Sequence, residues 1–183
     1  MLSQQQVTEQ LSNTIGKPGI LKLSRLLKEQ DFPLRDIIDI TFHPDKNIAF
    51  RAAWILENLL LQKPESYIEH LNYLNSRVKD VGNPSCKRHY AKILMHITAP
   101  KAPANIKQRL AETDLEPVVE QLFDWLIDPK VLIAVKVFAA EALFNLRERY
   151  PWISEELANQ IRFLMRDGTA AIQSRGRKLL AKL

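Results

Sequence analysis

The sequence predicts an all-α solenoid, a right-handed α–α superhelix, that is internally duplicated. One group of residues recurs 87 positions later: Ala52-Ala53, Asn58-Leu59 and Pro64 return as Ala139-Ala140, Asn145-Leu146 and Pro151. A second group recurs 86 positions later: Ile93-Leu94 and Ile97 return as Leu179-Leu180 and Leu183. Apolar residues are also spaced three or four apart over most of the chain, as one face of a helix requires. Self-similarity combined with helical spacing is typical of stacked helical units.

The first half is divided by prolines into segments with helical spacing. Ile68, Leu71, Leu74 and Val78, for example, place apolar groups on one helical face. Pro33, Pro44, Pro64 and Pro84 fall at starts or gaps, where a missing amide proton costs little. The expected helices are Ile20–Glu29, Leu34–Phe42, Asn47–Gln62, Glu65–Lys79 and Ser85–Thr98. Residues 1–19 are expected to form an N-terminal arm or capping helix.

The second half follows the same plan. Val118, Leu122 and Leu126 form one apolar stripe, and Ser154 followed by two glutamates predicts a capped helix start. The expected helices are Ala104–Glu112, Glu116–Ile127, Val131–Arg149, Ser154–Arg166 and Ala170–Lys182. No long linker interrupts the chain, so residues 20–183 are predicted to form a single repeat domain with halves at about 20–101 and 102–183.

Composition indicates a soluble protein. Hydrophobic residues make up 46% of the 183 residues and charged residues 26%, which is ordinary for a globular chain. The polar, glutamine-rich segment from Met1 to Asn13 does not resemble a secretory signal, and no apolar run reaches the ~18–20 residues that span a bilayer. The single cysteine, Cys86, favours a reducing compartment. We therefore expect a cytoplasmic protein with no membrane partner.

One segment resembles a known repeat closely. Asp128-Pro129 is followed by Val135-Lys136, Ala139-Ala140, Ala142-Leu143 and Leu146. This pattern resembles the HEAT repeat, whose turn carries an aspartate and whose second helix opens with Val-Arg. Segments that begin at Asp45, Asp80 and Asp167 resemble it less closely, with Trp54 and Gln173 as departures from the usual residues. The resemblance covers about Leu34 to Leu183 as four helix pairs, and the additional helices before each half are closer to armadillo-like arrays.

The resemblance also implies roles for four polar residues. In HEAT repeats the turn aspartate and the basic residue of the second helix bond to neighbouring units in a ladder. By this resemblance Asp45, Arg51, Asp128 and Lys136 form a structural ladder.

No constellation of residues indicates an enzyme. The four histidines are dispersed, and no pair of them accompanies a glutamate at metal-ligand spacing. Gly16-Lys17-Pro18-Gly19 is too short for a phosphate-binding loop, and Cys86 occupies an apolar position of its helix. We therefore expect no catalytic, cofactor-binding or metal-binding residues.

Two of the expected helices are basic and lack acidic residues. Their cations are Lys87, Arg88, Lys92, Arg175, Arg177 and Lys178. The 86-residue register superimposes Lys92 on Lys178, and in HEAT-like solenoids the second helices line the concave face. Together with the net charge of +5, this pattern predicts a surface for an anionic partner. The alternative is that these cations only keep exposed helices soluble.

Three functional hypotheses remain open. The first is a non-catalytic scaffold that recognises a partner protein through the concave face. The second is a nucleic-acid-binding protein resembling the HEAT-like DNA alkylation-repair glycosylases, for which Trp125 with Asp124 or Asp128 is the only local pair to consider. The third is a subunit that is stable only as part of a larger assembly, because Leu179, Leu180 and Leu183 give the C-terminal helix an apolar edge. This hypothesis predicts a homodimer through that helix.

Overall fold

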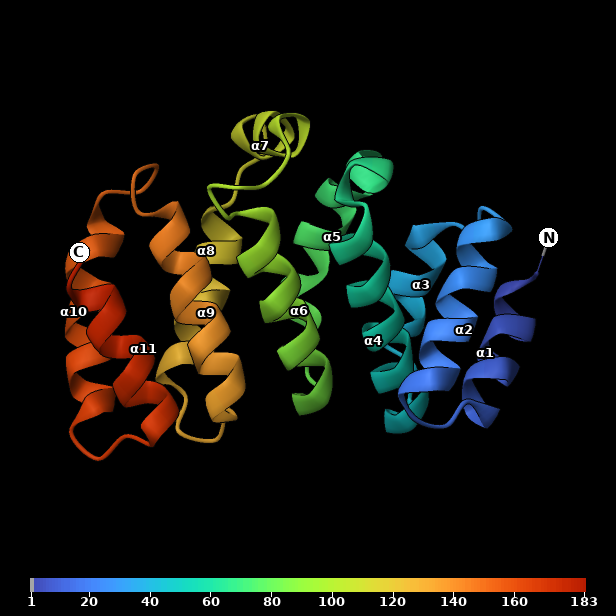
Figure 1. Ribbon diagram of the computed structural model, residues 1–183, viewed down its shortest axis with the longest axis horizontal. Coiled ribbons are helices and arrows are strands. Elements are labelled where there is room, and N and C mark those ends of the chain that lie inside the picture. The colour runs from blue at the N-terminus through green and yellow to red at the C-terminus, as the bar shows by residue number, and fades with distance from the viewer. Residues whose placement is uncertain (1) are drawn as a thin grey trace.

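Helix pairs stack along the length of the molecule in two layers (Figure 1). The computed structural model describes residues 2–183, which contain eleven α-helices, two 3-10 segments and no strand. The first helices of the pairs are α1 (Gln4–Asn13), α3 (Leu34–Ile40), α5 (Leu71–Arg77), α8 (Glu116–Ile127) and α10 (Trp152–Met165). The second helices, nearer the viewer in Figure 1, are α2 (Gly16–Glu29), α4 (Lys46–Gln62), α6 (Pro84–Ile97), α9 (Ile133–Leu146) and α11 (Ala170–Leu180). The predicted all-α solenoid is confirmed.

The N-terminal segment adds a pair that the repeat pattern did not include. α1 is a regular helix whose Val7 and Leu11 are fully buried, and both α1 and α2 pack against α4. The chain therefore has five helix pairs instead of about four. The boundary expected after residue 19 falls at the first turn of α2, which begins at Gly16; this residue has a positive φ of 66°, which glycine adopts without strain.

One predicted helix is divided. The segment expected at Glu65–Lys79 consists of the 3-10 segment η1 (Pro64–His70), α5, and the 3-10 segment η2 (Val78–Asp80). Tyr67 has non-helical angles, φ −125° and ψ 18°, so the chain bends there. Apolar spacing continues through the bend, and for this reason the sequence pattern does not reveal it.

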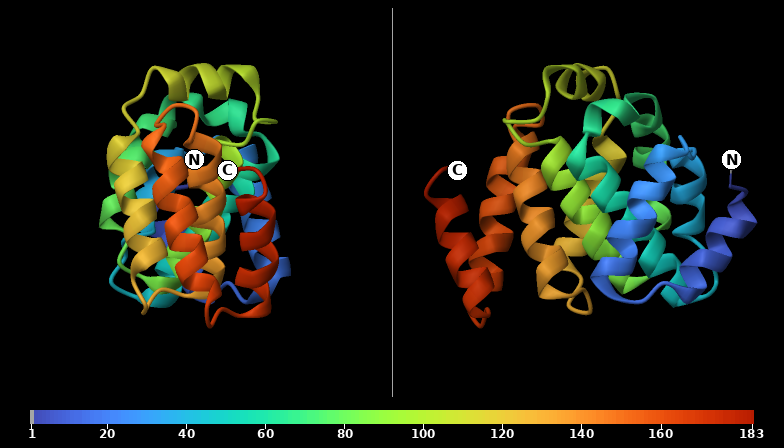
Figure 2. Two further views of the ribbon diagram at one scale, coloured as in Figure 1. Left: turned by 90° about the vertical axis from the view of Figure 1, so that its left-hand side faces the viewer. Right: turned by 45° about the vertical axis from the view of Figure 1, so that its right-hand side comes forward.

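The two helices that precede the duplicated pairs take different positions. α2 lies in the second layer, whereas α7 (Ala104–Ala111) packs on η1 at one edge of the stack (Figures 1 and 2). Arg149 holds the end of α7, because its guanidinium donates to the carbonyls of Leu110 at 2.6 Å and Thr113 at 2.7 Å. With α7 displaced, α6 packs directly on α9 and joins the two halves.

Small buried residues and a hydrogen bond from a side-chain amide stabilise the packing between second helices. Ala52, Ala53, Ala139 and Ala142 are fully buried, which lets neighbouring helices approach closely. At the junction of the halves, Asn145 of α9 donates to the Met95 carbonyl of α6 at 3.1 Å.

Within residues 2–183, no helix is both long and apolar enough to cross a membrane.

Candidate interaction surface

The second helices α4, α6 and α9 keep one stripe each that no other helix covers. On α9 the incompletely buried positions recur every three or four residues, from Ala134 through Phe138 and Glu141 to Phe144. The corresponding stripes of α4 and α6 carry both aromatic and charged groups. We call these stripes together the second-helix surface; its main residues are Phe50, Trp54, Arg88, Lys92, Met95, His96, Ala134, Phe138, Glu141 and Phe144.

A buried polar cluster lies between α4 and α6. The Glu57 carboxylate, with its side chain 9% exposed, accepts from His89 Nδ1 at 2.6 Å and from Lys92 Nζ at 2.5 Å. Burial alone would raise the pKa of Glu57, but the bonds from His89 and Lys92 outweigh burial and lower it. The cluster therefore keeps Glu57 ionised and paired with Lys92 beneath the second-helix surface.

Aromatic rings cover this cluster. The His89 ring lies 6.1 Å from Trp54 in a stacked arrangement and 5.4 Å from Phe50. His89 Nε2 is buried and has no hydrogen-bond partner in the described part of the chain. His89, Trp54 and Phe50 thus form a packed platform on α4 and α6, with Lys92 at its margin.

A second acid–base pair repeats this arrangement further along the stack. Glu141 of α9 and Arg175 of α11 are 2.6 Å apart. In both halves, therefore, an acid on one second helix bonds to a base on the next. The sequence pattern pointed to Lys92 and Arg175 but not to Glu57 and Glu141, because each acid lies on the preceding second helix. The signal available was Glu57, the one carboxylate within α4, at a position that falls among apolar residues.

The six predicted cations do not lie on one continuous strip. α9 separates α6 from α11 and presents Phe138 and Phe144 between them. Lys92 and Arg175 are bound to carboxylates, and Lys87 is partly buried. Arg88, Arg177 and Lys178 are exposed and have no ion-pair partner within residues 2–183. An anion-binding role for the set remains a prediction.

The four residues of the predicted ladder make mostly local contacts. Asp45 caps α4 by accepting from the backbone of Asn47 at 2.7 Å, and Asp128 accepts from the backbone of Lys130 at 2.8 Å. Arg51 does link two pairs, since it donates to the carbonyls of Leu11 and Ser12 at the end of α1, both at 2.8 Å.

Lys136 lies inside the stack and is 4% exposed. Burial lowers its pKa, and the nearby charge of Asp128 opposes that change. In the part of the chain that is described, no hydrogen bond or ion pair joins Asp45 to Arg51 or Asp128 to Lys136.

Other sequence candidates occupy structural positions. Trp125 is 2% exposed and belongs to the core, whereas Asp124 points to solvent on the first layer. Cys86 is buried, and burial raises the pKa of its thiol to about 12. Among residues 2–183 no group of three or more histidine, cysteine or acidic side chains could hold a metal ion.

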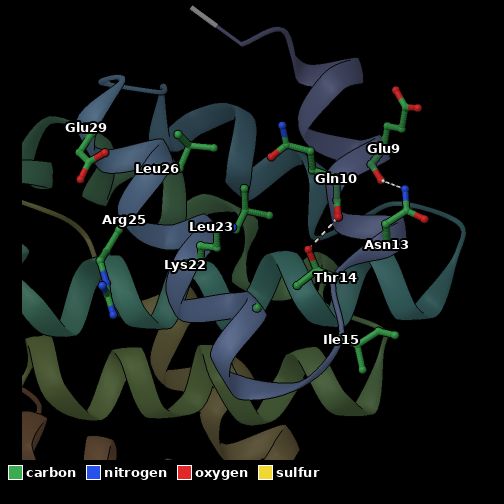
Figure 3. Close-up of a pocket in the computed structure, with 11 residues that line it drawn as sticks. Glu9, Gln10, Asn13, Thr14, Ile15, Lys22, Leu23, Arg25, Leu26 and Glu29 are labelled. Carbon is green, nitrogen blue, oxygen red and sulfur yellow. Dashed lines mark hydrogen bonds between the residues drawn. The ribbon is translucent and has the colours of Figure 1, made fainter.

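A groove between α1 and α2 was not predicted. It has a volume of about 670 Å³ and lies at the N-terminal end of the stack (Figure 3). Leu23, Leu26 and Gly19 line it from α2, and Gln10 and Asn13 line it from α1.

The stacked pairs and their uncovered second helices define a helical repeat protein. The HEAT repeat domain family matches residues 7–183, so the chain belongs to this family. The match includes most of α1, in agreement with the fifth pair described above. No curated protein matches the sequence significantly.

Proposed function

We propose that this HEAT repeat protein is a non-catalytic scaffold that recognises a partner protein through its second-helix surface. In HEAT-like solenoids the second helices line the concave face. The observation that carries the proposal is the combination of partly buried aromatic rings with charges that are already paired. Trp54, Phe138 and Phe144 supply apolar contact, while Glu57–Lys92 and Glu141–Arg175 supply polar groups of both signs.

This mixture favours a protein partner over a phosphate backbone. Aromatic residues and arginine are enriched at the centres of protein interfaces. Arg147 lies 3.8 Å above the Phe144 ring, so the edge of the surface offers an amphipathic side-chain pair of that kind. A nucleic-acid groove depends on unpaired cations along its length, and α9 contributes none to the surface.

The test is affinity capture from the native cell with matched variants. Arg88→Glu combined with Ala134→Glu changes two exposed positions of the surface and should abolish recovery of the specific partner. Glu120→Lys combined with Lys130→Glu changes two exposed positions elsewhere and should leave recovery intact. Equal recovery with both double variants, each shown to be folded by thermal denaturation, would contradict the proposal.

Nucleic-acid binding is the second candidate, favoured by the exposed Arg88, Arg177 and Lys178 and the net charge of +5. Fluorescence anisotropy with random duplex and single-stranded DNA across a salt series tests it. Tight, steeply salt-dependent binding that falls on Arg177→Glu and Lys178→Glu would support it. No binding near physiological salt would remove it and leave the scaffold.

A further inference from the structure

The groove between α1 and α2 has a shape and size that fit one helix. α4 packs against both α1 and α2 on the inner side, so the two helices are already splayed enough to contact a single helix together. The groove opens on their other side, and its volume is about 670 Å³. The α2 lining runs from Gly19 to Glu29, roughly 15 Å of helix, and α1 lines the groove from Glu9 to Asn13, so the groove accommodates nearly three turns of a partner helix along α2.

The lining of the groove is apolar at the base and charged at the rims. Leu23 and Leu26 of α2 form the base, and Gln10 extends from α1 toward them (Figure 3). Gly19 is packed against Thr14 at the closed end, where an added Cβ would lie 3.0 Å from its methyl group. Ile15, 82% exposed, extends the apolar base toward the α1–α2 turn. Such a base fits the apolar stripe of an amphipathic helix.

The rims differ in charge. Lys22 and Arg25 lie on the α2 side, with Glu29 as the last residue of α2, and Glu9 lies on the α1 side. All four are exposed, and none has an ion-pair partner in the described chain, so the α2 rim keeps a net positive charge. A complementary helix carries acidic residues on the flank that faces α2 and a basic residue on the flank that faces α1.

The last helix of a second copy does not fit this description. In the 86-residue register Arg177 of α11 corresponds to Ala91 of α6, which is fully buried in the stack. α11 therefore presents Arg177 where α6 packs a small alanine, and it carries Lys178 beside it. Its cations would also meet Lys22 and Arg25.

We propose that the α1–α2 groove binds an amphipathic helix of a partner protein, with a leucine-type stripe against Leu23 and Leu26 and acidic residues against Lys22 and Arg25. This site is distinct from the second-helix surface. It would let the scaffold engage a second segment of the same partner or a different protein.

Two synthetic helices test the site. Both are side-chain-stapled 14-residue peptides with leucines at i, i+3, i+7 and i+10 and lysines on one flank; the other flank carries glutamates in the first peptide and lysines in the second. The wild-type protein should bind the glutamate peptide at least about tenfold more tightly by fluorescence anisotropy, and hydrogen exchange should slow in α1 and α2.

Charge reversal in the protein gives the decisive comparison. The double variant Lys22→Glu with Arg25→Glu should bind the peptide with lysines on both flanks more tightly than the glutamate peptide. A misfolded variant could not show this inverted preference. The double variant Arg88→Glu with Ala134→Glu should keep the wild-type preference, because it alters only the second-helix surface. Binding of neither peptide by the wild type, or a preference unchanged by reversing Lys22 and Arg25, would overturn the inference.

Discussion

Replacing Glu57 with glutamine should destabilise the protein by an amount that the buried cluster determines. The carboxylate accepts from His89 at 2.6 Å and Lys92 at 2.5 Å, and its side chain is 9% exposed. A hydrogen bond to a charged group contributes about 1.5–3 kcal/mol. Glutamine retains one acceptor oxygen but places an NH₂ donor against a second donor. We therefore expect Glu57→Gln to lower the free energy of unfolding by about 2–3 kcal/mol near pH 7.

The assay is urea denaturation followed by circular dichroism, with thermal denaturation as a second measure. For a domain of this size the loss corresponds to a fall in Tm of about 4–12 °C. Glu141→Gln is the matched control. It breaks the pair with Arg175, which is 44% exposed, and should cost less than about 1 kcal/mol because solvent screens that charge.

The pH dependence of the free energy of unfolding separates the contribution of the Glu57 charge from that of side-chain packing. Glu57 has a folded-state pKa below its ordinary value of 4.5. Its charge therefore stabilises the fold fully above pH 4.5, and this contribution disappears as pH falls through the lowered pKa. The stability difference between wild type and Glu57→Gln should shrink below pH 4.5. A difference under about 0.5 kcal/mol at pH 7, or one that grows as pH falls, would refute the reasoning.

Three further changes test other parts of the structure. Arg51→Ala should release the end of α1 at a cost of about 1–2 kcal/mol, because two carbonyls lose their donor; faster hydrogen exchange confined to α1 checks this. Cys86, whose thiol pKa is raised to about 12 by burial, should resist a disulfide reagent at pH 8 until urea unfolds the chain, and rapid labelling of native protein would argue against its placement. Gly168→Ala should destabilise by about 1–3 kcal/mol, because the new Cβ would collide with the Leu164 carbonyl oxygen; Gly82→Ala, with nothing within 4 Å, is the control, and equal effects on Tm would contradict the packing.

The repeat pattern was sufficient to predict the fold because it records the packing of successive units. Ala52-Ala53 and Ala139-Ala140 recur where second helices approach closely, and all four alanines are buried. The position of α7 could not be predicted in the same way. Its apolar spacing resembles that of α2, and only the three-dimensional contact with η1 and the bonds from Arg149 determine its place at the edge.

The charges of the surface were harder to predict than its helices. Lys92 and Arg175 stand out in the sequence because their own helices lack acids. Their partners, Glu57 and Glu141, lie more than 30 positions earlier on neighbouring helices, and the angle between helices decides whether they meet. The groove between α1 and α2 was missed for a related reason, since a polar, glutamine-rich segment gives little indication of a packed helix.

Site-specific photo-crosslinking in the native cell tests the central claim most directly. A photoreactive phenylalanine analogue at Phe138 reports contacts of the second-helix surface, and the same analogue at Glu120 reports contacts of the first layer. We expect discrete protein adducts from position 138 and none from position 120. Equal protein adducts from both positions, or adducts with nucleic acid alone, would contradict the proposal that this HEAT repeat protein recognises a partner protein through its second helices.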